Sequence, residues 1–110
     1  MKHRVVVTGV GAISAVGESS EQTWQAMLSG TSGIAPITLF DASNFSVKIQ
    51  AEVKSEPKKL LQRDERVTAK QLKHMNRSVT FALLSTLEAL DDSQLEICEK
   101  NALLEKIIGS

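Results

Sequence analysis

Two glycines that follow an apolar run are the first residues whose type and spacing could serve chemistry. Gly9 and Gly11 come soon after three valines at positions 5–7. A strand that leads into such a turn can place a pyrophosphate group on a helix N-terminus. The third position of that dinucleotide fingerprint is Ser14, however, and Gly17 comes three residues late. We therefore interpret the turn as a point of close backbone packing and keep a small dinucleotide-binding domain as an alternative.

A nucleophile and a metal site are the next chemistry to consider. Cys98 is the single cysteine, and the acidic residues on each side of it would raise the pKa of its thiol. We interpret it as a half-buried structural residue. One cysteine cannot form an internal disulfide, which is typical of a reducing compartment. His3 and His74 lie far apart, with no cysteines or carboxylates at metal-ligand spacing around them.

Basic residues are concentrated in one part of the chain, although the formal net charge is zero. Positions 54–77 hold eight basic and three acidic residues, a net charge of +5. A stripe at helical spacing, with one histidine beside it, consists of Arg66, Lys70, Lys73, His74 and Arg77. No aromatic residues are interleaved with it, so it does not indicate a nucleic-acid surface. We interpret it as a solvated helix face or as a docking surface for an acidic protein.

The elements that must position these residues follow from apolar spacing. Residues 4–8 are expected to form a strand in the middle of a parallel sheet, because the three valines are apolar on both faces. A short helix follows, with Ser19 and Gln22 at capping-box spacing and Gly30 just past its end. Three of its side chains are expected to face the core: Trp24, Met27 and Leu28.

Later elements are predicted to be mostly helical. Pro36 argues against a central strand around it. Residues 45–53 alternate as a half-exposed strand, and Pro57 opens a helical region. One long helix is expected from Thr68 to Asp91. Its apolar face consists of Leu72, Met75, Val79, Leu83, Leu87 and Leu90. Residues 103–110 read as a strand that enters another glycine turn, which suggests a fragment of a longer protein.

Composition is that of a globular protein. Of the 110 residues, 42% are hydrophobic and 24% are charged. No apolar run approaches the roughly 20 residues of a membrane span. The valines at positions 5–7 are too short a run for a signal peptide. We expect a cytoplasmic protein with no membrane or nucleic-acid partner.

The ordered set of motifs resembles the opening of β-ketoacyl-acyl carrier protein synthases of the KAS II type. The matching positions are 4–11, 14, 16–17, 23–24, 28–30, 32–34, 40–41, 75–77, 82, 88–90 and 108–110. Two departures are Ala15, where the family usually has Pro, and Asn76, where it usually has Asp. Residues 62–71 are hard to align, and residues 102–106 replace the usual lead-in to the next strand.

The resemblance implies a partial thiolase-like α/β fold, the N-terminal part of its first α/β/α/β/α half, with no domain boundary within residues 1–110. It implies a 3-oxoacyl-[acyl-carrier-protein] synthase, which catalyses decarboxylative Claisen condensation of an acyl group with malonyl-acyl carrier protein in fatty acid or polyketide biosynthesis. The family's catalytic cysteine and two histidines lie beyond residue 110. This chain alone is therefore expected to be inactive, with no catalytic, metal or cofactor-binding residue.

The resemblance also implies partners. Basic residues before the Met-Asp pair of the family dock the acidic acyl carrier protein, and by position these are Lys70, Lys73 and His74, with Arg66 and Arg77 extending the stripe. The carrier's phosphopantetheine arm brings the substrate, so no dissociable cofactor is expected. The full-length protein is expected to form a homodimer or a ketosynthase heterodimer. Two alternatives remain: a non-catalytic ketosynthase-like partner (a chain-length factor), and a basic-helix interaction module with no catalytic parent.

Overall fold

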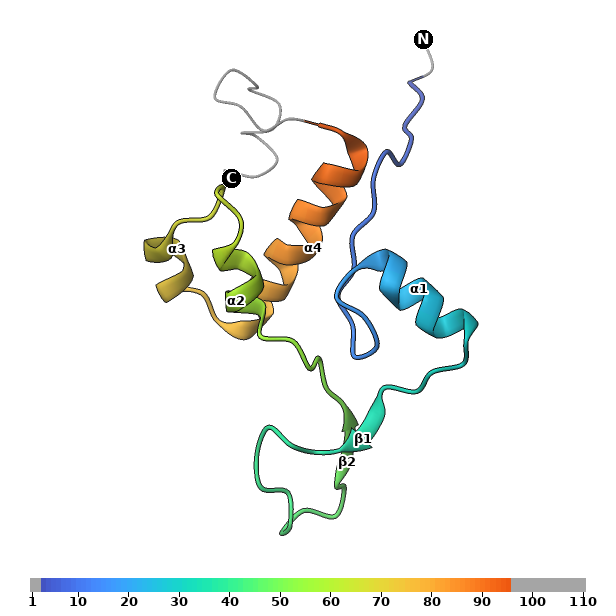
Figure 1. Ribbon diagram of the computed structural model, residues 1–110, viewed down its shortest axis with the longest axis vertical. Coiled ribbons are helices and arrows are strands. Elements are labelled where there is room, and N and C mark those ends of the chain that lie inside the picture. Colours follow the sequence, from blue (N-terminus) through green and yellow to red (C-terminus); the bar gives the residue numbers. More distant parts are fainter. Residues whose placement is uncertain (1–2, 96–110) are drawn as a thin grey trace.

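The chain combines four helices with one small sheet in the residues that the computed structural model describes, 3–95 (Figure 1). In chain order the elements are α1 (Ser20–Leu28), β1 (Ile34–Pro36), β2 (Ile49–Ala51), α2 (Pro57–Gln62), α3 (Ala69–Lys73) and α4 (Arg77–Ser93). This mixed content agrees with the α/β class. The two described strands are antiparallel, so the predicted parallel sheet is not part of this region.

The valines at positions 5–7 do not lie in a strand. Their exposed fractions are 94%, 71% and 84%, and residues 3–13 belong to no helix or strand. The predicted strand at residues 4–8 is therefore wrong for the described structure. A strand is defined by its hydrogen-bonded neighbours, and no described segment pairs with this one. The segment instead runs beside the C-terminal half of α4 and away from the body of the molecule (Figure 1).

Helix α1 begins and ends where the sequence predicts. The Ser19 hydroxyl accepts a hydrogen bond from Gln22 N at 3.2 Å. The Gln22 side chain accepts from Glu18 N at 2.9 Å, one residue before the N-cap, so only half of the predicted capping box forms. At the other end Gly30 has φ +71°, and Thr31 N donates to Ala26 O at 2.9 Å. This left-handed turn satisfies the last carbonyl groups of the helix.

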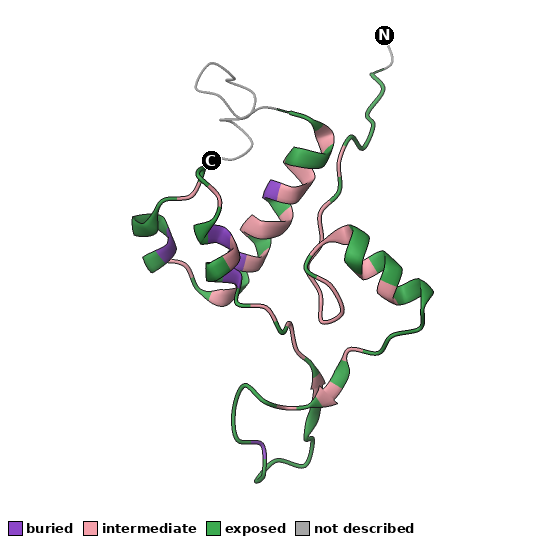
Figure 2. Cartoon of the chain, in the orientation of Figure 1, coloured by how far each residue is buried: buried purple, intermediate pink, exposed green. Residues whose placement is uncertain are grey.

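The apolar face of α1 is not buried. Trp24, Met27 and Leu28 are 55%, 63% and 63% exposed, and Figure 2 shows most of the helix in the colour of exposed residues. The prediction that these side chains face the core is wrong, because no described element covers that side of α1. The chain's radius of gyration is 17.2 Å, against about 13 Å for a compact domain of this length.

Strands β1 and β2 form a short hairpin at one end of the molecule (Figure 1). Ile34 pairs with Ala51 and Pro36 with Ile49. Pro36 lies at the end of a strand that has a partner on one side only, as expected for a residue without an N–H group. The strand predicted over residues 45–53 is limited to β2, because the residues before β2 form a loop in which Phe45 N donates to Ala42 O at 3.0 Å.

The apolar core lies among α2, α3 and α4. Leu61, Leu72 and Leu87, one from each helix, are at most 7% exposed and form a single cluster. Figure 2 shows buried positions on each of these three helices. Partly buried side chains pack around them: Val67, Met75, Leu83 and Leu84. Pro57 occupies the first turn of α2, as its position predicts.

The single helix predicted from Thr68 to Asp91 is two helices. α3 ends at Lys73 and α4 begins at Arg77. Between them Asn76 has extended backbone (ψ 175°), and its side chain accepts from Val79 N at 2.9 Å. Asparagine favours such an N-cap because its short side chain replaces the missing backbone acceptor. α4 ends at Ser93, two residues after the predicted end, with Gln94 left-handed at φ 62°.

Two sequence predictions lie outside the described residues: the strand over 103–110 and the setting of Cys98. Among residues 3–95, no helix has both the length and the apolar character needed to cross a membrane.

Candidate functional site

Helix α3 presents the lysines of the candidate docking surface, which we define as Arg66, Lys70, Lys73, His74 and Arg77. Thr68 caps α3: its hydroxyl accepts from Gln71 N at 3.2 Å, while Thr68 N donates to Gln71 Oε1 at 2.9 Å. Residues three apart on a helix are neighbours, so Lys70 and Lys73 share one face. Both are exposed, whereas Leu72 is buried in the core.

The structure divides the docking surface into two groups. Lys70, Lys73 and His74 are exposed, and His74 is the C-cap of α3. None of the ion pairs found within residues 3–95 involves Lys70 or Lys73. Arg66 and Arg77, in contrast, both bind groups of their own chain. Spacing in the sequence placed the four basic residues on one stripe with His74 beside it, but did not reveal this division.

Arg66 lies between two carboxylates, an arrangement that we call the Arg66 clasp (Asp64, Arg66 and Asp91). Arg66 Nε and Nη2 donate to the two oxygens of Asp64 at 2.9 and 2.6 Å. Nη1 and Nη2 donate to the two oxygens of Asp91 at 2.8 and 3.1 Å. The hydrogen bonds from Arg66 hold the pKa of Asp64 below its usual value, and the two carboxylates raise the pKa of Arg66.

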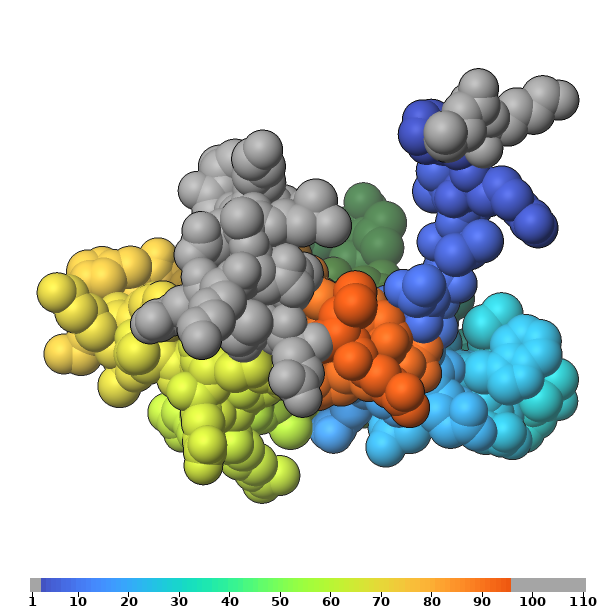
Figure 3. Space-filling model, turned by 90° about the horizontal axis from the view of Figure 1, so that it is seen from above, coloured from blue at the N-terminus to red at the C-terminus, as the bar shows by residue number. Residues whose placement is uncertain are grey.

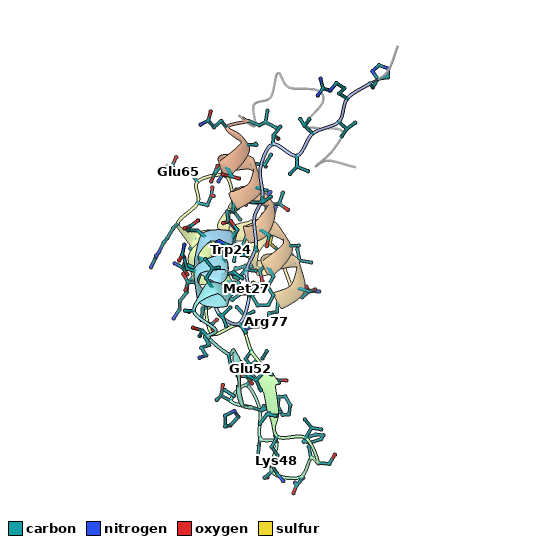
Figure 4. All side chains as sticks on the ribbon, turned by 90° about the vertical axis from the view of Figure 1, so that its right-hand side faces the viewer. Trp24, Met27, Lys48, Glu52, Glu65 and Arg77 are labelled. Carbon is teal, nitrogen blue, oxygen red and sulfur yellow. The ribbon has the colours of Figure 1, made fainter. Side chains whose placement is uncertain are left out.

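Arg77 ties the start of α4 to the segment that follows the hairpin. Its Nη2 donates to Val53 O at 2.8 Å, and its guanidinium carbon lies 4.8 Å from the centre of the Phe81 ring. A guanidinium group at that distance from an aromatic face is attracted to it. Figure 4 shows Arg77 between the helical part of the molecule and the hairpin that carries Glu52 and Lys48.

The glycine turn is pressed against α4. A Cβ atom on Gly11 would lie 2.0 Å from Ser85 O, and one on Gly9 would lie 2.2 Å from Ala89 O. Only glycine permits an approach of this kind. In the space-filling view of Figure 3, the N-terminal segment lies directly against α4. The interpretation of the turn as a point of close packing is confirmed.

The N-terminus of α1 is occupied by a carboxylate of the same chain. Glu88 Oε1 accepts from Ser20 N at 2.7 Å and from Ser20 Oγ at 2.9 Å, while Oε2 accepts from Ala12 N at 2.7 Å. Nearby, Asp92 Oδ2 accepts from Val10 N at 3.0 Å. A helix N-terminus favours an anion, and here Glu88 supplies it. The dinucleotide alternative is therefore wrong, because a pyrophosphate group would need the same place.

The role of Glu88 was not predicted. It was noted only as a position that matches the family, and its partners lie 68 and 76 residues earlier in the chain. The available signal was an acidic residue on α4 away from the leucine face, which does not by itself identify a partner.

A polar hollow of about 430 Å³ lies between the glycine turn and the segment after β2. Three of its lining side chains form hydrogen bonds: the Ser14 hydroxyl lies 2.8 Å from that of Thr23, and Ser55 Oγ donates to Glu18 at 2.5 Å. Among the described residues no buried side-chain polar atom lacks a partner.

Comparison with known proteins decides the family. A model described as the β-ketoacyl synthase N-terminal domain matches residues 2–109. The chain belongs to the β-ketoacyl synthase family. The resemblance noted in the sequence is thereby confirmed.

Relatives within this family carry a specific name. The chain is 43% identical over 101 residues to the 3-oxoacyl-[acyl-carrier-protein] synthase 2 of Coxiella burnetii, and 42% identical to the enzyme of that name from Vibrio harveyi. It is 34% identical over 99 residues to that of Staphylococcus aureus. Each alignment covers 90–92% of this chain but 23% of the relative. The chain thus spans about a quarter of the length of these β-ketoacyl synthases.

Proposed function

We propose that this chain is the N-terminal segment of a 3-oxoacyl-[acyl-carrier-protein] synthase with a thiolase-like fold. The proposal rests on one observation: a match to the family's N-terminal domain along residues 2–109, with relatives that are named as this synthase. The reaction of the whole enzyme is a decarboxylative Claisen condensation between an acyl group and malonyl-acyl carrier protein. The nucleophilic cysteine and the two histidines of this reaction are supplied by residues beyond 110.

The contribution of this segment is recognition of the acyl carrier protein. Lys70, Lys73 and His74 are exposed and lie together on or beside α3, as a surface for an acidic partner requires. Substrates arrive on the carrier's phosphopantetheine arm, so no dissociable cofactor is needed. We place the full-length protein in the cytoplasm, as a homodimer or a ketosynthase heterodimer.

Charge reversal tests the docking surface. In the full-length protein, the double variant Lys70→Glu/Lys73→Glu is expected to weaken carrier-protein binding by about tenfold at low salt, or about 1.4 kcal/mol. It should also reduce the dependence of the dissociation constant on ionic strength, because fewer charge pairs remain to be screened. Isothermal titration calorimetry at several salt concentrations measures both.

The matched control is Lys48→Glu/Lys54→Glu, which makes the same change in net charge. Both residues are exposed, and Lys48 lies at the far end of the hairpin (Figure 4). This variant is expected to bind the carrier nearly as the wild type does. Equal affinity of the α3 variant and the wild type would contradict the proposed docking function.

A further inference from the structure

The Arg66 clasp joins two parts of the helical cluster that are distant in sequence. Asp64 and Arg66 lie in the connection between α2 and α3, and Asp91 lies 25 residues later, in the last turn of α4. Four hydrogen bonds of 2.6–3.1 Å hold the guanidinium group between the two carboxylates. The connection is thus fixed to α4 two residues before Thr68, the residue that caps α3.

Helix α3 buries little of its own surface, although Val67 before it and Met75 after it pack against the core. It is five residues long, and Leu72 is its only buried residue. A helix this short is not stable by itself, because the cost of forming the first turn is not recovered. The direction of α3, and with it that of Lys70 and Lys73, therefore depends on what fixes its two ends. The clasp lies at the first end, and the break at Asn76 lies at the second.

The charge of Arg66 is already used within the chain. The clasp contains one cation and two carboxylates, so it carries a net negative charge. For Arg66 to bind an acidic partner, it would have to give up bonds to Asp64 and Asp91. It is therefore poorly suited to direct docking, although its place in the sequence fits the basic stripe.

We infer that Arg66 is a positioning residue for the docking surface: through Asp64 and Asp91 it fixes the connection before α3 and so directs Lys70 and Lys73 towards the acidic carrier protein. This inference rests on the proposed function of α3. It assigns the clasp a role in binding although the clasp itself does not touch the partner.

The inference predicts that Asp91→Asn changes the affinity for the carrier protein in the direction opposite to that expected from charge alone. Asp91→Asn removes a negative charge close to a basic surface, so electrostatic attraction alone would strengthen the binding of an acidic protein. If the clasp positions α3, the same change weakens binding, because an amide cannot accept the paired hydrogen bonds of the guanidinium group. The sign of the change in affinity therefore separates the two roles.

The test is carried out on the full-length protein with the phosphopantetheine-bearing acyl carrier protein as the probe. Asp91→Asn and Arg66→Lys are each expected to raise the dissociation constant about three- to tenfold; lysine keeps the charge but lacks the planar fork. In the enzyme assay KM for the carrier-bound substrate should rise while kcat stays near the wild-type value. Hydrogen exchange at residues 66–74 should become faster.

Glu65→Gln is the matched control. It makes the same charge change next to the clasp, at an exposed residue that is not part of it (Figure 4). Its dissociation constant and its hydrogen exchange at residues 66–74 are expected to match the wild type.

Each outcome decides one question. If Asp91→Asn binds the carrier as tightly as the wild type or more tightly, the positioning role of Arg66 is wrong. If Lys70→Glu/Lys73→Glu leaves affinity unchanged, the docking function itself fails, and the inference fails with it. If the lysine variant and both clasp variants weaken binding while Glu65→Gln does not, the two proposals stand together.

Discussion

The helical cluster of α2, α3 and α4 and the N-terminal half of the chain, residues 9–53, are held together in different ways. The helical cluster closes around the side chains of Leu61, Leu72 and Leu87. In the N-terminal half, carboxylates accept hydrogen bonds from backbone N–H groups instead. Glu88 binds Ala12 and Ser20, and Glu52 binds the backbone N–H groups of Thr38 and Leu39.

Exposed apolar side chains follow the same division. Of the 15 large hydrophobic residues that are exposed in the described structure, 13 lie between positions 5 and 49. Burial of apolar area stabilises a fold at any pH, since it involves no charge. Carboxylate hydrogen bonds fix geometry, but their net contribution is small because the same groups are hydrogen-bonded to water in the unfolded chain. The N-terminal half should therefore be the weaker part.

The largest effect is expected from a change in the apolar cluster. Leu61 is fully buried (0% exposed), and Leu61→Ala should lower the free energy of unfolding by about 2–5 kcal/mol, because it removes buried methyl groups and leaves a cavity. Urea denaturation of the full-length protein measures the loss. Leu28→Ala, at a residue 63% exposed, should change stability by less than about 0.5 kcal/mol. If the two variants lost similar amounts of unfolding free energy, the proposed difference in apolar burial between the two regions would be wrong.

A smaller and more local effect is expected at Glu88. Glu88→Ala should destabilise the docking of residues 9–20 on α4 by about 1.5–3 kcal/mol, since three donors lose a charged acceptor. Hydrogen exchange should accelerate at Ala12 and Ser20 but not within α2. Asp92→Asn serves as the milder comparison, because Asp92 accepts one hydrogen bond, from the exposed Val10 N–H. Unchanged protection at Ala12 in the Glu88 variant would show that burial, and not the carboxylate, holds this segment.

The smallest effect is confined to the hairpin loop and depends on pH. Hydrogen bonds led by the one from the Thr38 hydroxyl lower the pKa of Glu52 from 4.5 to about 2. A carboxyl with a lowered pKa stabilises the folded loop above its unfolded pKa and loses that contribution as pH falls. The loop should therefore loosen between about pH 4.5 and pH 2.

NMR titration of the Thr38 and Leu39 amide signals follows this loosening. In Glu52→Gln the signals should lose their pH dependence in that interval. A wild-type midpoint at 4.5 would mean that the carboxylate does not hold the loop in solution.

Features set by neighbouring residues could be predicted from the sequence. Ser19, Gly30 and Pro57 lie where their backbone preferences place them, at helix ends. Leu72 and Leu87 were assigned correctly to an apolar face, whereas Val79, assigned to the same face, lies just after the break and is 46% exposed. The break itself was missed, since Asn76 is compatible with the interior of a helix as well as with its N-cap.

Features that depend on distant residues could not be predicted. The valines at positions 5–7 have the composition of a buried strand, but composition does not supply a neighbouring strand, and they are exposed. For the candidate site, spacing identified the basic stripe, and it could not show that Arg66 and Arg77 bind Asp91 and Val53. Those contacts depend on how the helices pack, which cannot be read from the spacing of residues in the sequence.

The anchoring of the glycine turn on α4 has a consequence for synthesis on the ribosome. Ala12 leaves the ribosome first, yet its acceptor Glu88 is translated 76 residues later. At about 5–20 residues per second, the delay is on the order of 4–15 s. During that interval the glycine turn has no docking site and is open to chaperones and proteases. The earliest-made part of this chain is thus among the last to reach its final place.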